Sequence, residues 1–286
     1  MTSTALMLFR PVRYRLIYFV LSLTVIIPGI YSLVTQGLSL GIDFTGGSHM
    51  VWQGEGLTEE KIRETASTAK VEIISVSTQG DRWQITTNPL NTELHGRLVP
   101  DDVKELSYET IGPTLGEELV KKTLLSISLA SLLILIYVAR RFRSIRYGTS
   151  AILAMLHDVA IVLGIFSSMR LEVDTLFVTA LLTILSFSVH DTIVVYDRIR
   201  ELKKKHGYLD FEEIVNRAVV ETMSRSLNNS MTIIFMLLAL LLMGGETINN
   251  FIFALLIGTI SGTYSSTFTA APLLVVWDKL ARRLKK

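Results

Sequence analysis

Asp191 is an acidic residue inside an otherwise apolar stretch of the chain. It follows His190 in the run from Leu176 to Tyr196, and Asp197-Arg198 then marks the return to water. A carboxylate inside a bilayer costs several kcal/mol, so it is kept only where it faces protein or a water-filled cavity. We therefore predict that Asp191 belongs to an ion or proton site. The alternative is an internal structural salt bridge.

Arg225 is the cationic residue expected to act with Asp191. It precedes the polar residues Ser226 and Asn228 where the next apolar run begins. The two runs cross in opposite directions, so both charges lie at comparable depth. An arginine favours the ionised form of a nearby acid and burial opposes it, so water or substrate entering between them would shift the balance. This arrangement suits a protonatable relay, with anchoring of a helix at the interface as the alternative for Arg225.

Asp158 and His190 complete the predicted relay. Asp158 lies near the midpoint of the apolar run Tyr147–Met169, beside His157, and a structural role is its alternative. Polar residues with helical spacing form one stripe on the run that contains Asp191, and this stripe consists of Thr179, Thr183, Ser186 and His190. No third ligand of suitable geometry accompanies His157 and His190, so packing residues are expected there rather than metal ligands.

Membrane helices are needed to position these residues. The chain has 286 residues, of which 49% are hydrophobic, and contains six runs long enough to cross a bilayer. We predict spans at 16–35, 119–138, 147–169, 175–197, 226–244 and 250–277. The first resembles a secretory signal but is too long and lacks a cleavage site, so an uncleaved span is expected. The sixth carries Gly258 and Gly262 in a spacing that allows close helix packing.

Positively charged residues give the orientation of these spans. Of 28 Lys and Arg residues, 19 lie in the head 1–15, the turn between the second and third spans, the loop 198–225 and the tail 278–286. The short loops on the other side carry only Arg170. Both termini are therefore expected in the cytoplasm and residues 36–118 outside it. The loop 198–225 interleaves apolar and charged residues, which predicts an amphipathic helix on the membrane surface.

The exported segment 36–118 is large enough for a small domain. Between Gln36 and Val120, 14 acidic and 6 basic residues give a net charge of −8, which argues against binding of nucleic acid or anionic lipid heads. We predict a ferredoxin-like βαββαβ domain, with helices from Thr58 and from Thr92 through Lys104, and strands at 49–53, 71–78, 82–87 and 105–111. The chain has no cysteine, so it has neither disulfides nor thiolate metal sites.

Two glycine-rich stretches join this domain to the spans. Gly41-Ile42-Asp43-Phe44-Thr45-Gly46-Gly47 follows the first span, and Gly112-Pro113-Thr114-Leu115-Gly116 precedes the second. Neither is accompanied by a Walker-type lysine, so nucleotide binding is not predicted. We interpret both as hinges, because glycine supplies the backbone freedom that a swinging domain needs, and plain loops are the alternative. Neither a nucleophile–base pair nor a metal cluster is visible in the domain, so no enzymatic activity is predicted.

These motifs, in this order, resemble a known family. One span, an exported domain and five further spans resemble half of a resistance-nodulation-division transporter. The Gly41–Gly47 and Gly112-Pro113 segments, with Phe187–Glu201 and Arg225–Asn228, are similar to the SecF branch of the SecD/SecF family. His190 departs from the family, which usually has asparagine there, and Asn229 stands where threonine is usual. The first departure leaves the local protonation behaviour open.

The resemblance implies a role in protein export at the bacterial inner membrane. SecF-type chains pair with SecD, associate with the SecYEG channel and often YajC, and use a proton or sodium gradient, without a bound cofactor, to draw unfolded preproteins outward. Residues matching Asp191 and Arg225 belong to the family's proposed proton pathway. Two alternatives remain: a small-molecule or lipid exporter half, for which an outer domain of ~80 residues is small, and an assembly subunit that moves no ions.

Overall fold

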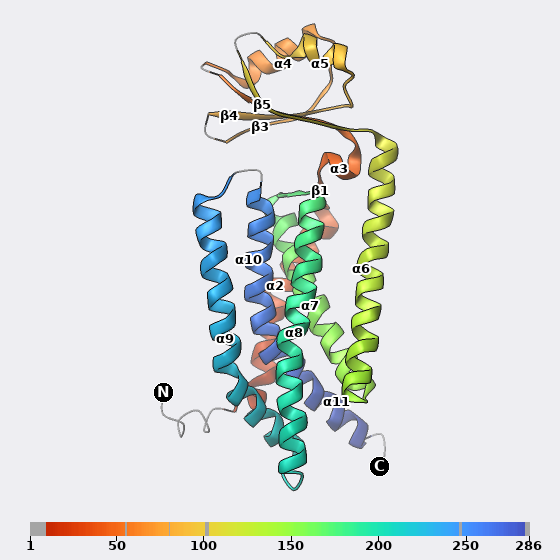
Figure 1. Cartoon of the computed structure of the whole chain (residues 1–286), viewed down its shortest axis with the longest axis vertical. Coiled ribbons are helices and arrows are strands. Elements are labelled where there is room, and N and C mark those ends of the chain that lie inside the picture. Colours follow the sequence, from red (N-terminus) through yellow and green to blue (C-terminus); the bar gives the residue numbers. More distant parts are fainter. Residues whose placement is uncertain (1–9, 55, 80, 101–102, 246–247, 284–286) are drawn as a thin grey trace. The chain divides into compact units, whose positions relative to one another are not determined.

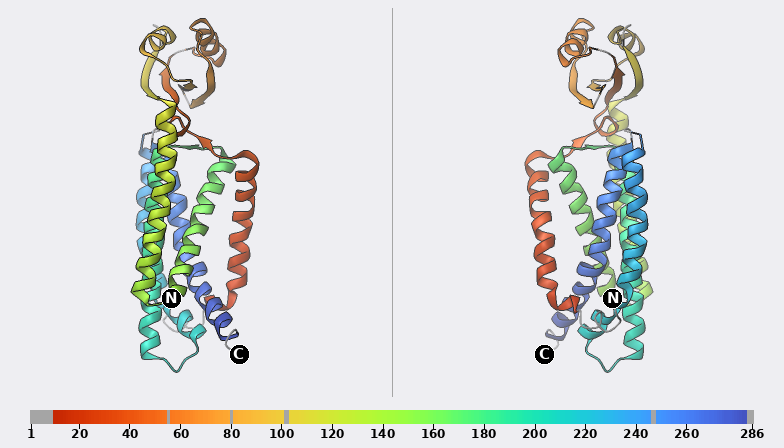
Figure 2. Two further views of the ribbon diagram at one scale, coloured as in Figure 1. Left: turned by 90° about the vertical axis from the view of Figure 1, so that its right-hand side faces the viewer. Right: turned by 90° about the vertical axis from the view of Figure 1, so that its left-hand side faces the viewer.

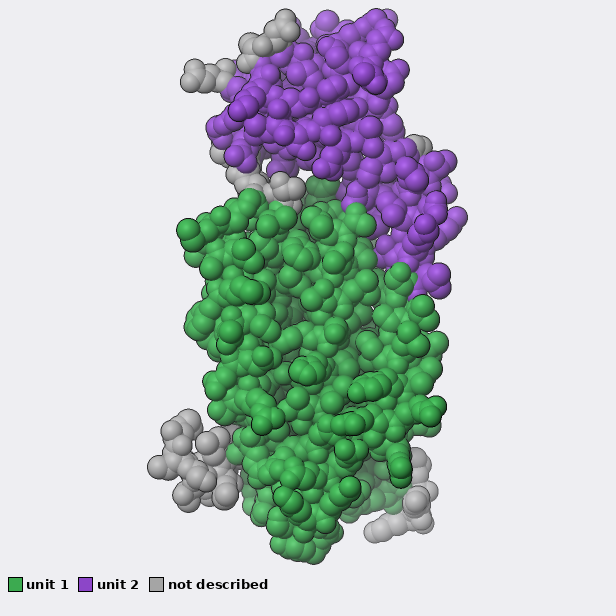
Figure 3. All heavy atoms as spheres, in the orientation of Figure 1, with its two compact units in different colours: residues 1–39, 126–286 green, residues 40–125 purple. Residues whose placement is uncertain are grey.

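The computed structural model describes residues 10–54, 56–79, 81–100, 103–245 and 248–283. Residues 1–9 of the predicted head and 284–286 of the predicted tail lie outside the described residues. The chain divides into two compact units, residues 1–39 with 126–286 and residues 40–125 (Figure 3). The first unit contains most of the apolar helices, and the second contains the polar segment that follows the first span.

Six helices of the described chain are long and apolar enough to cross a membrane (Figure 1). The first combines the 3-10 turn η1 (Pro11–Tyr14) with α2 (Arg15–Gln36), and the sixth combines α10 (Asn249–Ser265), the π-helix η3 (Ser266–Ala270) and α11 (Ala271–Arg283). The others are α6 (Pro113–Phe142), α7 (Ile145–Met169), α8 (Thr175–Lys205) and α9 (Phe211–Met243). The prediction of a mainly helical membrane protein with six candidate spans is confirmed.

The segment 198–225 differs from its prediction as a separate surface helix. Helix α8 continues to Lys205 and α9 already begins at Phe211, so the segment is the tip of a helical hairpin. An ion pair one turn apart, Lys205 with Glu201, supports the end of α8. Asp210 caps α9 by accepting a hydrogen bond from the Glu212 backbone N–H. Both helices therefore continue through the charged residues at the membrane boundary instead of ending there.

The spans differ strongly in how far they are packed within the chain. More than half of the apolar window of α8 (56%) is buried, whereas only 6% of that of α6 is buried. Helix α2 lies beside α7 (Figure 2), and the two backbones approach closely at a pair of glycines. A Cβ atom on Gly29 would lie 2.8 Å from the Cα atom of Gly164, so only glycine fits this crossing. This contact fixes the first span against the third.

The second unit contains a four-stranded antiparallel sheet with strand order β3-β4-β2-β5. Its elements are β2 (Gly47–Gln53), α4 (Glu59–Thr68), β3 (Ile73–Gln79), β4 (Arg82–Thr87), α5 (Thr92–Leu98) and β5 (Lys104–Ile111). Met50, Trp52 and Ile85 of the sheet pack with Ile62 and Leu98 of the helices. Helix α5 is shorter than predicted: it ends at Leu98, since a residue before proline, here Val99, disfavours helical backbone.

Candidate functional site

Asp191 lies in α8 and is buried within the chain, with 4% of its surface exposed. Its Oδ2 atom accepts a short hydrogen bond from the Ser226 hydroxyl of α9. Ser226 directly follows Arg225 in the chain, so α9 brings both predicted partners to α8. Within the described chain, however, Asp191 forms no ion pair with Arg225. The hydroxyl of Ser226, rather than the guanidinium, contacts the acid in this state.

Arg225 lines a polar cavity of about 490 Å³ between α8 and α9. The charged residues around it are paired: Arg198 contacts Glu201 and Glu221. Asp197 contacts Arg141 and Arg200. Arg225 is exposed and has no ion-pair partner among the described residues. Among the described residues Arg225 is therefore the lining cation without an ion pair, and it directly precedes Ser226, whose hydroxyl binds Asp191.

Asp158 occupies a second, fully buried centre between α7, α8 and α10. Its Oδ2 atom accepts hydrogen bonds from Ser188 (2.6 Å) and Ser265 (2.7 Å). Its Oδ1 atom accepts one from Ser261 (2.5 Å) and lies 3.0 Å from His157 Nδ1. Four potential donors from three helices thus surround one carboxylate, which satisfies the polar group inside the membrane region.

His157 connects this centre to the first span. Its Nε2 atom lies 2.9 Å from the Ser22 hydroxyl of α2. Ser22 Oγ in turn lies 3.4 Å from the Tyr264 hydroxyl of α10, and Tyr264 donates to the backbone carbonyl of Tyr18 at 2.8 Å. The structure therefore does not join Asp158 to Asp191 by hydrogen bonds among the described residues, although both were predicted in one relay.

His190, the fourth predicted relay residue, is exposed on α8. The other three residues of its stripe, Thr179, Thr183 and Ser186, are exposed as well. The two threonine hydroxyls bond to carbonyls one turn earlier in their own helix. One face of α8 is therefore polar and is not covered by other described parts of this chain.

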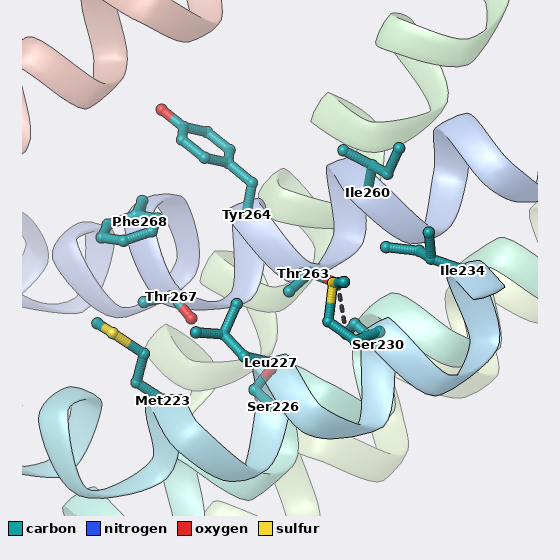
Figure 4. A pocket seen from close by; sticks show the side chains of 11 residues that line it. Met223, Ser226, Leu227, Ser230, Ile234, Ile260, Thr263, Tyr264, Thr267 and Phe268 are labelled. Atoms are coloured by element: carbon teal, nitrogen blue, oxygen red, sulfur yellow. Dashed lines mark hydrogen bonds between the residues drawn. The ribbon is translucent and has the colours of Figure 1, made fainter. Parts of the chain in front are cut away.

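A second cavity, of about 290 Å³, lies between α9 and the sixth span (Figure 4). Its lining is mainly apolar and includes Met223, Leu227 and Phe268. Ser226, which donates to Asp191, and Tyr264, whose hydroxyl lies 3.4 Å from that of Ser22, also line it. A hydrogen bond from Thr263 to Ser230 (2.6 Å) joins the two helices at its floor.

The predicted hinge glycines lie in a tightly packed joint. Gly41 precedes the short helix α3 (Ile42–Thr45), which contains Asp43, and Gly46 and Gly47 then adopt φ angles of 70° and 140°. Such angles favour glycine. A Cβ atom on Gly116 would lie 2.7 Å from the Phe44 carbonyl oxygen, whereas Gly112, before the start of α6 at Pro113, has open space. Their role as hinges stays a prediction.

The predicted packing glycines lie on α10 against α8. A Cβ atom on Gly258 would lie 2.3 Å from the Ile184 side chain, and one on Gly262 would lie 3.4 Å from that of Ser188. Ser188 is a donor to Asp158, so this close approach of α10 and α8 accompanies the buried centre.

Comparison with known proteins identifies the family. The model of the protein export membrane protein SecD/SecF C-terminal family matches residues 92–280, and that of the SecD/SecF GG motif matches residues 31–51. The chain is 43% identical to the protein translocase subunit SecF of Thermobaculum terrenum, with 93% of each chain covered. The chain belongs to the SecD/SecF family. The predicted family is thereby confirmed.

Fused relatives in this family are longer. The chain is 33% identical to the protein translocase subunit SecDF of Bacillus subtilis. The aligned region includes 95% of this chain but 38% of that protein. The crystal structure of SecDF from Thermus thermophilus, a translocon-associated membrane protein, matches with a TM-score of 0.86 at 33% identity. The chain spans 39% of that structure.

The sequence did not indicate Ser22 as a partner of His157. A single serine in the first apolar run is a weak signal, and only the crossing of α2 and α7 brings it to the third span. Ser261 and Ser265 carried a stronger signal, because their helical spacing next to the glycine pair predicts hydroxyls that bond across helices.

Proposed function

We propose that this chain is the SecF-type subunit of a preprotein translocase, in which ion passage at Asp191 and Arg225 promotes protein export. The observation that carries the proposal is a buried acid bonded to the hydroxyl of Ser226, the residue after Arg225, and Arg225 itself lines a polar cavity and has no ion-pair partner among the described residues. A buried acid and a nearby cation with room for water can exchange a proton or bind a cation. Asp158 and His190 remain predicted members of this relay.

The orientation follows from the charge distribution. Both termini lie in the cytoplasm of a bacterial cell, the chain crosses the inner membrane six times, and residues 36–118 lie outside the cytoplasm. The strand order β3-β4-β2-β5 with two crossing helices supports a ferredoxin-like outer domain. The cavity at Arg225 would then open near the cytoplasmic side.

The partner expected to cover the exposed polar face of α8 is SecD. Exposed Ser186 and His190 would be poorly solvated by lipid, so a second protein chain is the better neighbour. Fused SecDF relatives, which are more than twice as long, support this pairing. SecYEG, YajC and unfolded preproteins are the further partners implied by the family, and neither nucleic acid nor a bound cofactor is expected beyond the ion gradient.

Coupling needs a path from the ion site to the outer domain. Moving one charge through 100 mV is worth about 2.3 kcal/mol, which biases a two-state equilibrium several tens-fold. The glycine segments around Gly46 and Gly112 are the proposed points at which the outer domain responds. Since the Gly46–Gly47 segment and Gly116 are packed together, the response would be a rearrangement of this joint.

The test is Asp191→Asn in the full complex reconstituted in vesicles. We expect gradient-dependent release of a preprotein to fall at least tenfold, with complex assembly unchanged. Asp278→Asn, an acid in a surface ion pair with Arg146 and Arg282, is the matched control. Loss of assembly would favour a structural subunit, and retained coupling would remove Asp191 from the mechanism. Export of small apolar compounds without preprotein release would favour an exporter.

A further inference from the structure

His157 and Asp158 form a centre that no hydrogen bond among the described residues joins to Asp191. It is almost sealed within the chain: Asp158 is fully buried, and His157 is 9% exposed. Its hydrogen-bonded contacts run through α2, α7, α8 and α10. The hydrogen-bonding atoms can be counted one by one, because each partner has a known number of donors and acceptors.

One complete arrangement of hydrogens leaves the histidine neutral. His157 donates from Nδ1 to Asp158, and Nε2 accepts from the Ser22 hydroxyl. Tyr264 donates to the Tyr18 carbonyl. Ser22 then has no hydrogen for Tyr264, so the 3.4 Å contact between these two hydroxyls carries no bond. In this arrangement the centre has a net charge of −1.

A second complete arrangement contains one more proton. In one form, His157 is protonated on both nitrogens and donates from both. In the other, Asp158 carries the extra proton and donates it to Nδ1. In both forms Nε2 carries a hydrogen and donates it to Ser22. Ser22 accepts from Nε2 and turns its own hydrogen toward Tyr264 Oη, while Tyr264 still donates to Tyr18. The net charge is then zero, and rotation of one hydroxyl is the only change that the network needs.

We propose that His157 and Asp158 together bind one proton, and that its presence makes the Ser22–Tyr264 hydrogen bond between the first and sixth spans. No lysine or arginine among the described residues pairs with either side chain. Adding the proton therefore removes a charge that the membrane interior would strongly disfavour. Loss of the proton would release Ser22 from Tyr264 and thus loosen α2 from α10.

None of the other titratable groups near this centre neutralises the charge of Asp158 in place of the proton. The elements packed most extensively against α7 are α2, α8, α10, η3 and α11, and α6 also touches it at Gly148. Their titratable side chains away from the charged helix ends are Tyr18 and Tyr31 of α2, Tyr137 of α6, His190, Asp191 and Tyr196 of α8, and Tyr264 of α10, with Asp278 on α11 and none on η3. None of these side chains forms an ion pair with His157 or Asp158 in the described chain. The protonation of the pair therefore depends on His157 and Asp158 themselves and not on an ion-pair partner.

Nitrogen NMR of the full chain in lipid nanodiscs, labelled at its five histidines, tests the proton. His157→Gln assigns the signal. We expect His157 to keep a proton on Nε2 at neutral pH, with the extra proton on Nδ1 or on Asp158. Infrared spectra compared with Asp158→Asn distinguish those two positions. A neutral imidazole with hydrogen on Nδ1 alone, beside an ionised Asp158, at neutral pH would overturn the proposal.

Ser22→Ala tests the link between the spans. We expect crosslinking of cysteine pairs placed on α2 and α10 to lose its pH dependence, because Ser22 no longer joins Tyr264. Ser168→Ala is the matched control, since among the described residues its hydroxyl bonds only to the Gly164 carbonyl in its own helix. Unchanged pH dependence in Ser22→Ala would overturn the link.

The use of this proton in export rests on the proposed function, but the proton site does not. If the NMR result is as expected and Asp158→Asn retains gradient-dependent preprotein release, the centre lies outside the coupling route. In that case the proposal at Asp191 still depends on its own variant. The two failures are therefore distinguishable.

Discussion

The two intramembrane acids of this chain have opposite surroundings. Asp158 is enclosed by four potential donors from three helices. Asp191 accepts from the hydroxyl of Ser226, and the preceding residue, Arg225, lines a cavity without an ion-pair partner among the described residues. A carboxylate that the fold saturates contributes to one packed arrangement, whereas one that it leaves open can change its partner. Burial alone therefore does not distinguish the two acids; the number of donors that the fold fixes around each of them does.

The largest expected effect on stability is that of Asp158→Ala. We expect a loss of about 2–4 kcal/mol in the free energy of unfolding, because four donors lose their acceptor and membrane hydrogen bonds average ~0.6 kcal/mol each, with unsatisfied groups adding to this. Reversible unfolding in mixed micelles measures it. Asp191→Asn, which keeps an oxygen for Ser226, should change the same quantity by less than ~1 kcal/mol. Equal losses would break the contrast between the acids.

Gly29→Val tests whether the first span must approach the third for the buried centre to form. Its side chain would meet the Gly164 backbone, and such overpacking costs about 1–3 kcal/mol. We also expect the Ser22–His157 contact to be lost, which histidine NMR would detect. Gly245→Ala, where a Cβ atom has open space, is the control. An unaffected His157 signal would mean that this crossing does not position Ser22.

Arg225→Gln tests the cationic member of the proposed ion site at Asp191. We expect less than ~1 kcal/mol change in stability, since exposed charges contribute little, but a loss of gradient-dependent preprotein release of at least several-fold. Arg225→Lys should retain part of the release because it keeps the charge. The assay is release from reconstituted vesicles. A large stability loss with unchanged release would make Arg225 an anchor of α9.

Ser226→Ala should have the smallest effect. It removes the hydroxyl that Asp191 accepts from, so we expect stability to fall by about 1 kcal/mol or less and release to fall about two- to threefold. Ser224→Ala, at an exposed position on the same helix, is the matched control. If Ser226→Ala abolished release altogether, the serine itself would be a required member of the ion route.

The spans and the charged residues within them could be predicted because the cost of a charge in lipid is visible in a single sequence. Asp191 and Arg225 were found in this way. The contacts of Asp158 were less accessible, since Ser22 lies 135 residues from His157 and reaches it only through the Gly29–Gly164 crossing. The helix ends at Lys205 and Phe211 were missed because charged residues indicate where a segment meets water, but a helix can continue into water.

The domain of residues 40–125 shows the same division between local and distant information. Its order of strands and helices followed from alternation of apolar residues and from caps such as Thr58. The pairing of Gly116 with Phe44 did not, because flexible and tightly packed glycines look alike in a sequence. The structure reveals the constraint through the φ angles of Gly46 and Gly47 and through the lack of space beside Gly116.

The π-helical segment Ser266–Ala270 makes one part of the last span tolerant of a change in length. Its wider winding accommodates an extra residue relative to a regular helix, immediately after the Ser261 and Ser265 donors. Deleting one residue there would return the segment to regular helix and keep the following turns in register, whereas a deletion at the start of the regular helix Ala271–Arg283 would rotate the later turns by about 100°. In that second case exposed Val276 would take the place of buried Val275. Homologous genes should therefore tolerate a one-residue gap within Ser266–Ala270 more readily than just after it.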